Sequence, residues 1–399
     1  MTAVVTGIGV VAPNGLGAGE FWKATLEGRS GIAELTGFDS TRLRARLAGQ
    51  VRDFDPRQHL PARLLPQTDI STRYALAAAG WALADAALDP AELVDYEMSV
   101  VTANALGGFG YTHDELRNLW SKGPGYVSVY ESFAWFYAVN TGQISIRYGM
   151  RGPSCALVAE QAGGLDAVGH ARRTIRSGSA MAVAGGVDSA LDSWGWSSHL
   201  SSGRVSASGY RPFHTDADGH VPGEGGAILI IEDAAAFQRR GGGAAYGMIA
   251  GYASTFDPPP GAGRPPGLRR AAEMALADAG VAPRDVDVVF ADAAGVPELD
   301  RQEAAAIRGV FGDRGVPVTA PKSLTGRLFS GGGPLDVAAA LLSIRDGVVP
   351  GSPDIAGLDP AHGIDLVGEP RTGPVSTALV LARGRWGFNA AVVIRTYRA

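Results

Sequence analysis

The segment from Cys155 to Gly178, CALVAEQAGGLDAVGHARRTIRSG, has the pattern of a strand that turns sharply into a helix. The strand is predicted for residues 155–159 and the turn for the Gln-Ala-Gly-Gly that begins at Gln161. The helix follows with a regularly spaced apolar face of Leu165, Val168, Ala171 and Ile175. Such a turn commonly presents a nucleophile for covalent catalysis. An amide cannot attack, so the sequence predicts the support of a nucleophilic site without the nucleophile.

Cys155 is the only cysteine in the sequence, and it lies six residues before Gln161. Its place on the predicted strand indicates a small buried side chain rather than a nucleophile. A single cysteine also excludes a disulfide within the chain and a cysteine-based metal cluster. The glycines of GEGG, residues 223–226, open into a strand with no following helix or lysine. They are therefore tight turns rather than a phosphate-binding loop.

Helices and apolar strands alternate on both sides of this segment, which indicates an α/β layered fold. Ser71 is the expected N-cap of one of these helices. The predicted helices cover residues 71–88, 109–120, 268–279, 298–311 and 334–345. The predicted strands cover residues 4–11, 98–104, 180–188, 226–233, 286–293, 376–383 and 389–395.

A repeated pentapeptide suggests that the two halves of the chain are duplicates. ALADA occurs at residues 82–86 and again at 275–279, each time at the end of a predicted helix that precedes a buried strand. In an alanine-rich chain the five letters can coincide by chance, so the matching context is the stronger argument.

Composition restricts the class of protein. The chain has 399 residues, of which 46% are hydrophobic, enough for one large domain or two similar halves. The net charge is −5 and no basic patch indicates nucleic-acid binding. No apolar run reaches the roughly 20 residues that span a bilayer. The start, MTAVVTGIGVVAP, has the pattern of a first core strand rather than a signal peptide. We therefore expect a soluble, cytoplasmic protein without a membrane partner.

Three blocks of the sequence resemble the β-ketoacyl synthase family. They occur in the same order as in that family, and the similarity covers nearly the entire chain. They are VVTGIGVVAPNGLGAGEFWKATLEGRSGI, YRPFHTDADGHVPGEGGAILIIEDA and PKSLTGRLFSGGGPLDVAAALLSIRDGVVP. The resemblance implies a thiolase fold, with two duplicated βαβ halves in a layered α/β/α/β/α architecture. The halves are expected at residues 1–243 and 244–399.

Active members of this family use a cysteine that carries the acyl chain and two histidines that support decarboxylation and stabilise charge. All three positions differ in this chain. The resemblance places Gln161 at the cysteine, Asp292 at the first histidine and Arg327 at the second, while Lys322, Asp300 and Glu303 remain. Three coordinated losses imply that condensation chemistry is gone. We expect Asp292 and Arg327 to form an ion pair that fills the former site.

The chain is similar in particular to the chain length factor, or ketosynthase β, group of bacterial type II aromatic polyketide synthases. The similar stretches are EQAGGLDAV, FAWFYAVNTGQISIR and VPGEGGAIL. That resemblance implies a non-condensing subunit that pairs with a ketosynthase α subunit and forms much of the tunnel for the growing poly-β-ketone. No cofactor is implied beyond the phosphopantetheinyl acyl carrier protein, which delivers the substrate.

The resemblance also implies tunnel residues. Phe109, Thr112 and Leu116 share one helical face, and their volumes would limit the number of two-carbon units; an ordinary core stripe is the alternative. Trp194 is a candidate for the tunnel end, against plain aromatic packing. Phe133 is a candidate to reach across to the partner, against plain interface core.

Whether the chain is itself an enzyme stays open at this point. One alternative is a malonyl-carrier decarboxylase that uses Gln161 for chain initiation, although a free carboxylate at Asp292 would repel its substrate. The others are an active synthase that uses Cys155 and a homodimeric scaffold without a synthase partner.

Overall fold

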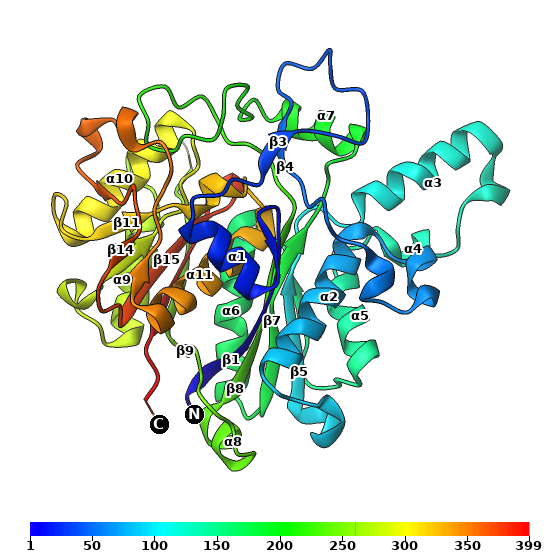
Figure 1. Cartoon of the computed structure of the whole chain (residues 1–399), viewed down its shortest axis with the longest axis horizontal. Helices are drawn as coiled ribbons and strands as arrows, with labels where there is room; N and C mark the ends of the chain where they lie inside the picture. The colour runs from blue at the N-terminus through cyan, green and yellow to red at the C-terminus, as the bar shows by residue number, and fades with distance from the viewer. Residues whose placement is uncertain (260, 399) are drawn as a thin grey trace.

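The computed structural model of the chain describes residues 1–259 and 261–398. A mixed, twelve-stranded sheet runs through the molecule (Figure 1). The first half contributes β1 (Ala3–Ala12), β2 (Gly15–Leu16), β5 (Met98–Ala103), β6 (Cys155–Leu157), β7 (Met181–Asp188) and β8 (Gly225–Asp233). The second half contributes β9 (Gly247–Phe256), β10 (Val288–Phe290), β11 (Pro317–Thr319), β13 (Asp365–Leu366), β15 (Thr377–Arg383) and β16 (Phe388–Arg395).

The two halves of the sheet have the same topology. The strand order is β6-β5-β7-β8-β1 in the first half and β11-β10-β15-β16-β9 in the second. In the first half, β5 pairs in parallel with β6 and β7, and the pairings β7–β8 and β8–β1 are antiparallel. In the second half, β10 pairs in parallel with β11 and β15, and the pairings β15–β16 and β16–β9 are antiparallel. The halves join where β1 pairs with β9. The α/β thiolase-like architecture and the duplication are therefore confirmed.

The helices form three layers around the two half-sheets. Helices α6 (Glu160–Arg176) and α11 (Gly332–Asp346) contact strands of both halves and make the middle layer. Helices α2 (Ile70–Asp85) and α5 (Val139–Tyr148) cover the outer face of the first half. Helices α9 (Leu268–Ala279) and α10 (Pro297–Phe311) cover the second. One apolar core contains residues of the middle helices and of both half-sheets, and two further cores lie between each half-sheet and its outer helices, which gives the expected α/β/α/β/α order.

The repeated ALADA has a structural reason. In α2, Ala82 and Ala86 approach Gly7 of β1 so closely that a Cβ on Gly7 would lie 2.1 Å from the Ala82 carbonyl oxygen. In α9, Ala275 and Ala279 approach Gly251 of β9 in the same way, with 2.2 Å to the Ala275 carbonyl oxygen. Small residues on both elements let each helix pack directly on a strand backbone.

Two helix starts differ from the prediction. The N-cap of α2 is Asp69, whose carboxylate accepts the Ser71 N–H at 2.8 Å, so Ser71 lies in the first turn. Helix α6 begins at Glu160, and Gln161 belongs to its first turn. The sharp turn is at Ala159 and Glu160, which has φ +49°. The glycines after Gln161 are helical; a Cβ on Gly164 would lie 2.3 Å from the Ser330 carbonyl oxygen, so they permit close packing instead of forming a turn.

One segment projects from this layered body, at the right of Figure 1. It contains α3 (Phe109–Lys122) and α4 (Glu131–Ala134), and it returns to the body at α5. No residue of α3 is buried, although the helix is amphipathic in sequence. Helices α1 (Ala18–Leu26), α7 (Ser193–Ser201) and α8 (Ala234–Arg239) complete the set. Within the described residues, no helix is both long and apolar enough to cross a membrane.

The close contact between α9 and β9 generates a prediction. Gly251→Ala should lower the stability of the full chain by about 1–3 kcal/mol, because the new methyl group must displace backbone of α9. Thermal unfolding followed by circular dichroism measures this. The control is Gly243→Ala, since a Cβ there meets no atom within 4 Å. Equal melting temperatures for the two variants would contradict the packing described.

Candidate functional site

Three residues from three separate elements meet where an active synthase would keep its catalytic groups. Gln161, in the first turn of α6, donates its Nε2–H to Asp292 Oδ1 at 2.9 Å. Arg327, in the loop before α11, reaches both oxygens of Asp292, each at 3.4 Å. All three side chains are buried, and Asp292 and Gln161 are fully so. The predicted Asp292–Arg327 ion pair is confirmed, and Gln161 adds a hydrogen bond to the same carboxylate.

Arg327 is held by more than one partner. Its Nη2 donates to the Arg383 carbonyl oxygen at 2.7 Å, and its Nε lies 3.7 Å from a carboxylate oxygen of Glu160. Burial alone would lower the pKa of Arg327, but the nearby Asp292 and Glu160 carboxylates outweigh it and raise the pKa. The guanidinium is therefore a permanent cation inside the former site.

Asp292 is also fixed through its backbone. The Asp292 N–H donates to Glu303 of α10 at 2.7 Å, and the adjacent Ala293 N–H donates to the second oxygen of Glu303 at 2.8 Å. The Arg383 N–H donates to Asp292 Oδ1 at 2.9 Å. Burial, together with the charge of Asp292, raises the pKa of Glu303 to about 8. The carboxylate of Asp292 thus has a fixed orientation.

The remaining family positions serve as supports around this cluster. Lys322 pairs with Asp336 of α11 at 2.5 Å and donates to the Ala291 carbonyl oxygen at the end of β10. Burial raises the pKa of Asp336 to about 6, while Lys322 opposes that shift. Asp300 accepts N–H groups of Phe213 and Gly295, both within 2.9 Å, and burial raises the pKa of Asp300 to about 7.

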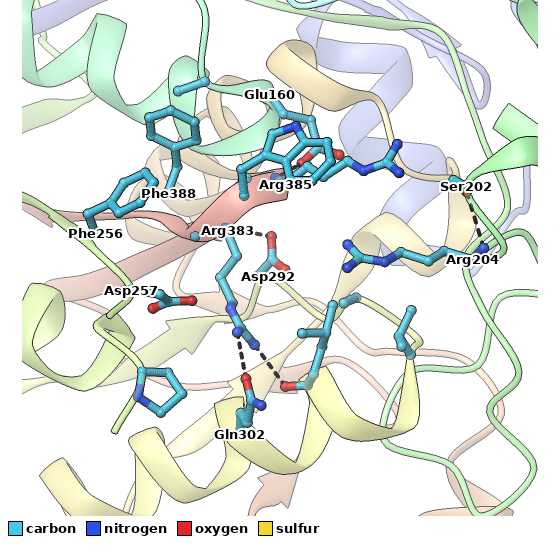
Figure 2. A pocket seen from close by; sticks show the side chains of 18 of the residues that line it. Glu160, Ser202, Arg204, Phe256, Asp257, Asp292, Gln302, Arg383, Arg385 and Phe388 are labelled. Atoms are coloured by element: carbon cyan, nitrogen blue, oxygen red, sulfur yellow. Dashed lines mark hydrogen bonds between the residues drawn. The ribbon is translucent and has the colours of Figure 1, made fainter. Parts of the chain in front are cut away.

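A cavity of about 1190 Å³ opens above the cluster. Figure 2 shows Asp292 between Arg383 and Arg204, with Glu160 above them. Arg383 is held to the α10 side by bonds to the Leu299 carbonyl oxygen and the Gln302 side chain, at 3.0 and 2.8 Å. The glycine-rich turn GRWGF, residues 384–388, contributes to the wall. The cavity that leads to the family's catalytic positions is therefore present in this chain, although the residues at those positions are different.

No thiol lines this cavity, and Cys155 cannot replace the missing one. Cys155 lies on β6, next to β5 and away from the cluster. It is half-buried rather than buried as predicted, because β6 is the last strand of the sheet in this chain. Partial burial raises the pKa of the Cys155 thiol, which disfavours the thiolate that attacks a thioester.

Four of the five predicted tunnel residues lie in the projecting segment, and the fifth, Trp194, lies on α7. The ring of Phe109 contacts the ring of Trp194 of α7 in a tilted arrangement, with ring centroids 4.6 Å apart and an interplanar angle of 43°. Phe133 of α4 meets the edge of Tyr130 at 5.9 Å. Phe109, Thr112, Leu116 and Phe133 are all half-buried, and none of them lines the cavity above Asp292. A core stripe is therefore wrong for α3, because no residue of this helix is buried in the chain.

Two members of the cluster, Glu160 and Arg383, were not predicted. A signal was available for Arg383, because it ends the predicted strand 376–383 and Asp292 lies near the end of the predicted strand 286–293. These strands, β10 and β15, pair in parallel, so their carboxyl ends lie at the same edge. Glu160 had no such signal, since its contact with Arg327 depends on the positive φ of the turn.

Comparison with known proteins agrees with this geometry. Residues 2–236 match the N-terminal domain of β-ketoacyl synthases, and residues 246–356 match the C-terminal domain. The chain belongs to the β-ketoacyl synthase family. It is 64% identical to the actinorhodin polyketide β-ketoacyl synthase 2 of Streptomyces coelicolor, over 100% of this chain and 99% of that one. It is 55% identical to the tetracenomycin polyketide synthase ketoacyl synthase β subunit of Streptomyces glaucescens, over 99% and 98%.

Solved structures of this β-ketoacyl synthase type also superpose on the chain. The ishigamide ketosynthase/chain length factor matches with a TM-score of 0.91 and 27% identity, over 100% of this chain and 99% of that one. A type II polyketide synthase acyl-carrier protein in complex with its ketosynthase, bound to the hexaketide, matches with a TM-score of 0.88 and 27% identity, over 99% of each chain. Within its family the chain is a ketosynthase β, or chain length factor, of type II polyketide biosynthesis.

The ion pair at the centre of the site generates a prediction. Arg327→Met should lower the free energy of unfolding by about 3 kcal/mol or more, because it leaves the Asp292 carboxylate buried without its counter-ion. Urea unfolding measures this. Adding Asp292→Asn to Arg327→Met should restore part of the loss. The control is Arg301→Met, which removes an exposed pair with Glu298 and should change stability by less than about 1 kcal/mol. Equal losses in the two single variants would refute the arrangement.

Proposed function

We propose that this chain length factor performs no condensation and shapes a cavity for a ketosynthase α subunit, which carries the cysteine and performs every condensation. The observation that carries the proposal is the closed cluster of Gln161, Asp292 and Arg327. Each of these three side chains, at the positions of the family's catalytic groups, is bound to another protein group inside this chain. A site in this state can hold a shape but cannot form a carbon–carbon bond.

An exposed apolar surface supports pairing with that second subunit. The projecting segment exposes large apolar side chains over a short stretch: Trp120, Tyr126, Val129, Trp135, Phe136 and Tyr137. Aromatic residues concentrated in this way are typical of protein interfaces. Strand β6 ends the sheet, and its outer edge has no partner strand within the described chain, whereas the equivalent β11 is covered by β13. We infer that the α subunit covers both features.

The tunnel is proposed for the same boundary. Phe109, Thr112 and Leu116 lie on one face of α3, and the chain itself does not bury them. With the α subunit in place, these three residues would form a wall of the tunnel. Trp194, which contacts Phe109, would lie at the end of the tunnel. Phe133 would lie where the tunnel crosses between the subunits. Side-chain volume along this wall then sets the number of two-carbon units. Leucine at position 116 is smaller than phenylalanine, which indicates a deep tunnel.

The substrate is proposed to arrive on an acyl carrier protein. One superposable structure contains a ketosynthase with its acyl-carrier protein and a bound hexaketide. The poly-β-ketone would therefore enter from the α subunit as a carrier-bound or cysteine-bound thioester, and the chain length factor would meet only its growing end. The strand repeat supports a division of this subunit into halves at 1–243 and 244–399.

Decarboxylation of malonyl carrier protein by Gln161 is the alternative that the sequence left open. The positive charge of Arg327 balances the negative charge of Asp292. The expected repulsion of the malonyl carboxylate is therefore weaker than for a free Asp292 carboxylate. The burial of Gln161 argues against the alternative instead: the amide donates to Asp292, and its side chain packs against Gly332. An amide that activates malonyl must reach the thioester.

This distinction generates a prediction. The purified subunit alone, given radiolabelled malonyl carrier protein, should release carbon dioxide at the background rate of heat-denatured protein. Gln161→Ala should give the same rate. Release above background that disappears in Gln161→Ala would establish the decarboxylase instead.

The tunnel generates a second prediction. Leu116→Phe, co-expressed with the α subunit and carrier protein, should shorten the main product by at least one two-carbon unit while total condensation continues. Mass spectrometry of the products measures this. The control is Leu358→Phe, which enlarges an equally half-buried leucine in the second half of the chain and should keep the parent product. An unchanged product from Leu116→Phe would refute tunnel control at this position.

A further inference from the structure

Helix α3 is positioned in this chain by polar anchors rather than by burial. Its Tyr111 N–H donates to Asp69 at 3.0 Å, and Asp69 is the residue that caps α2. Its Glu115 accepts the Ser128 N–H at 2.6 Å. Because no α3 residue is buried, these anchors decide where the helix sits, and a helix held in this way is displaced more easily than one in a core.

A further anchor joins α3 to α7. His113 Nδ1 lies 2.5 Å from Asp192 Oδ2, and both side chains are about three-quarters buried, with 22% and 24% exposed. Asp192 is the N-cap of α7, and its carboxylate also accepts the Trp194 N–H at 3.0 Å and the Gly195 N–H at 3.2 Å. One carboxylate therefore fixes the start of α7 and the middle of α3 together.

The two aromatic rings of the predicted tunnel end lie next to this anchor. His113 is one helical turn after Phe109 and shares the face of Thr112 and Leu116. Trp194 follows Asp192 by two residues. The rings of Phe109 and Trp194 meet at 4.6 Å, and the His113 ring lies 6.0 Å from Trp194. The His113–Asp192 contact and the ring contact therefore join the same two helices, α3 and α7.

We propose that His113 and Asp192 are positioning residues that hold the Phe109–Trp194 contact closed and thereby set the depth of the polyketide tunnel. This inference rests on the proposed function, since it assumes that the tunnel ends at these rings. It adds that the polar pair behind the rings, and not ring volume alone, determines chain length. Both residues act on chain length through the Phe109 and Trp194 rings.

The variants follow from the geometry. His113→Leu keeps the bulk and removes the donor. His113→Asn places an amide N–H near the position of Nδ1 and should restore the contact. Asp192→Ser keeps an N-cap for α7 but is too short to reach His113, so it tests the same contact from the other side without replacing the histidine.

The experiment uses the complex with the α subunit and carrier protein, with products measured by mass. His113→Leu and Asp192→Ser should each raise the ratio of longer to parent-length product about tenfold, the effect of losing one hydrogen bond to a charged group. The double variant should add little to either single change, because both remove one interaction. His113→Asn should stay near the parent ratio.

A second measurement reports on the helix directly. Hydrogen exchange of the backbone amides of residues 109–122 should be about tenfold faster in His113→Leu than in the parent complex, and near the parent rate in His113→Asn. Phe109→Ala is the reference for tunnel control and should lengthen the product without the polar change.

These results separate the two ideas. If Phe109→Ala lengthens the product while His113→Leu and Asp192→Ser keep the parent ratio and parent exchange rates, the positioning role is overturned and the proposed function stands. If all three keep the parent products, tunnel control fails and the positioning role fails with it. Longer products from His113→Asn equal to those from His113→Leu would also overturn the role of the hydrogen bond.

Discussion

A buried carboxylate, Asp292, is the constraint on which the centre of this molecule depends. Its side chain receives Gln161 from α6, Arg327 from the loop before α11 and the Arg383 N–H from β15. A charge without exposure to water must be compensated by partners of this kind, and removing one of them is costly. The carboxylate therefore ties the middle layer of helices to the second half-sheet at the point where an active synthase would hold its substrate.

The same constraint explains why the scaffold is kept while the chemistry is absent. The two half-sheets and their close glycine–alanine contacts bring the ends of α6, β10 and β15 to one place. In this chain that place is filled with an ion pair and an amide instead of a thiol and two imidazoles. The fold is preserved because the arrangement of surfaces depends on it, and the arrangement of surfaces is what a partner subunit would use.

The projecting segment has the opposite character. The centre of the molecule is fully buried and closed, whereas α3 has no buried residue and Trp120 is 77% exposed. Apolar side chains left in water are unfavourable for a chain that stays alone. The structure thus combines an inert centre with an incomplete boundary, and the polar anchors at Asp69 and Asp192 keep that boundary in one arrangement.

The sequence by itself determined the layered fold, the duplication, the loss of the nucleophile at Gln161 and the pairing of Asp292 with Arg327. Strand and helix periodicity and the family resemblance carry that information, because residue type and order are enough to state it. Only the tertiary structure decided that the sharp turn is at Glu160, that Arg383 closes the cluster, and that α3 projects instead of packing in the core. The first two features depend on contacts between segments more than 60 residues apart. The third depends on the absence of a covering layer, because an amphipathic helix has the same sequence pattern whether its apolar face contacts its own chain or another chain.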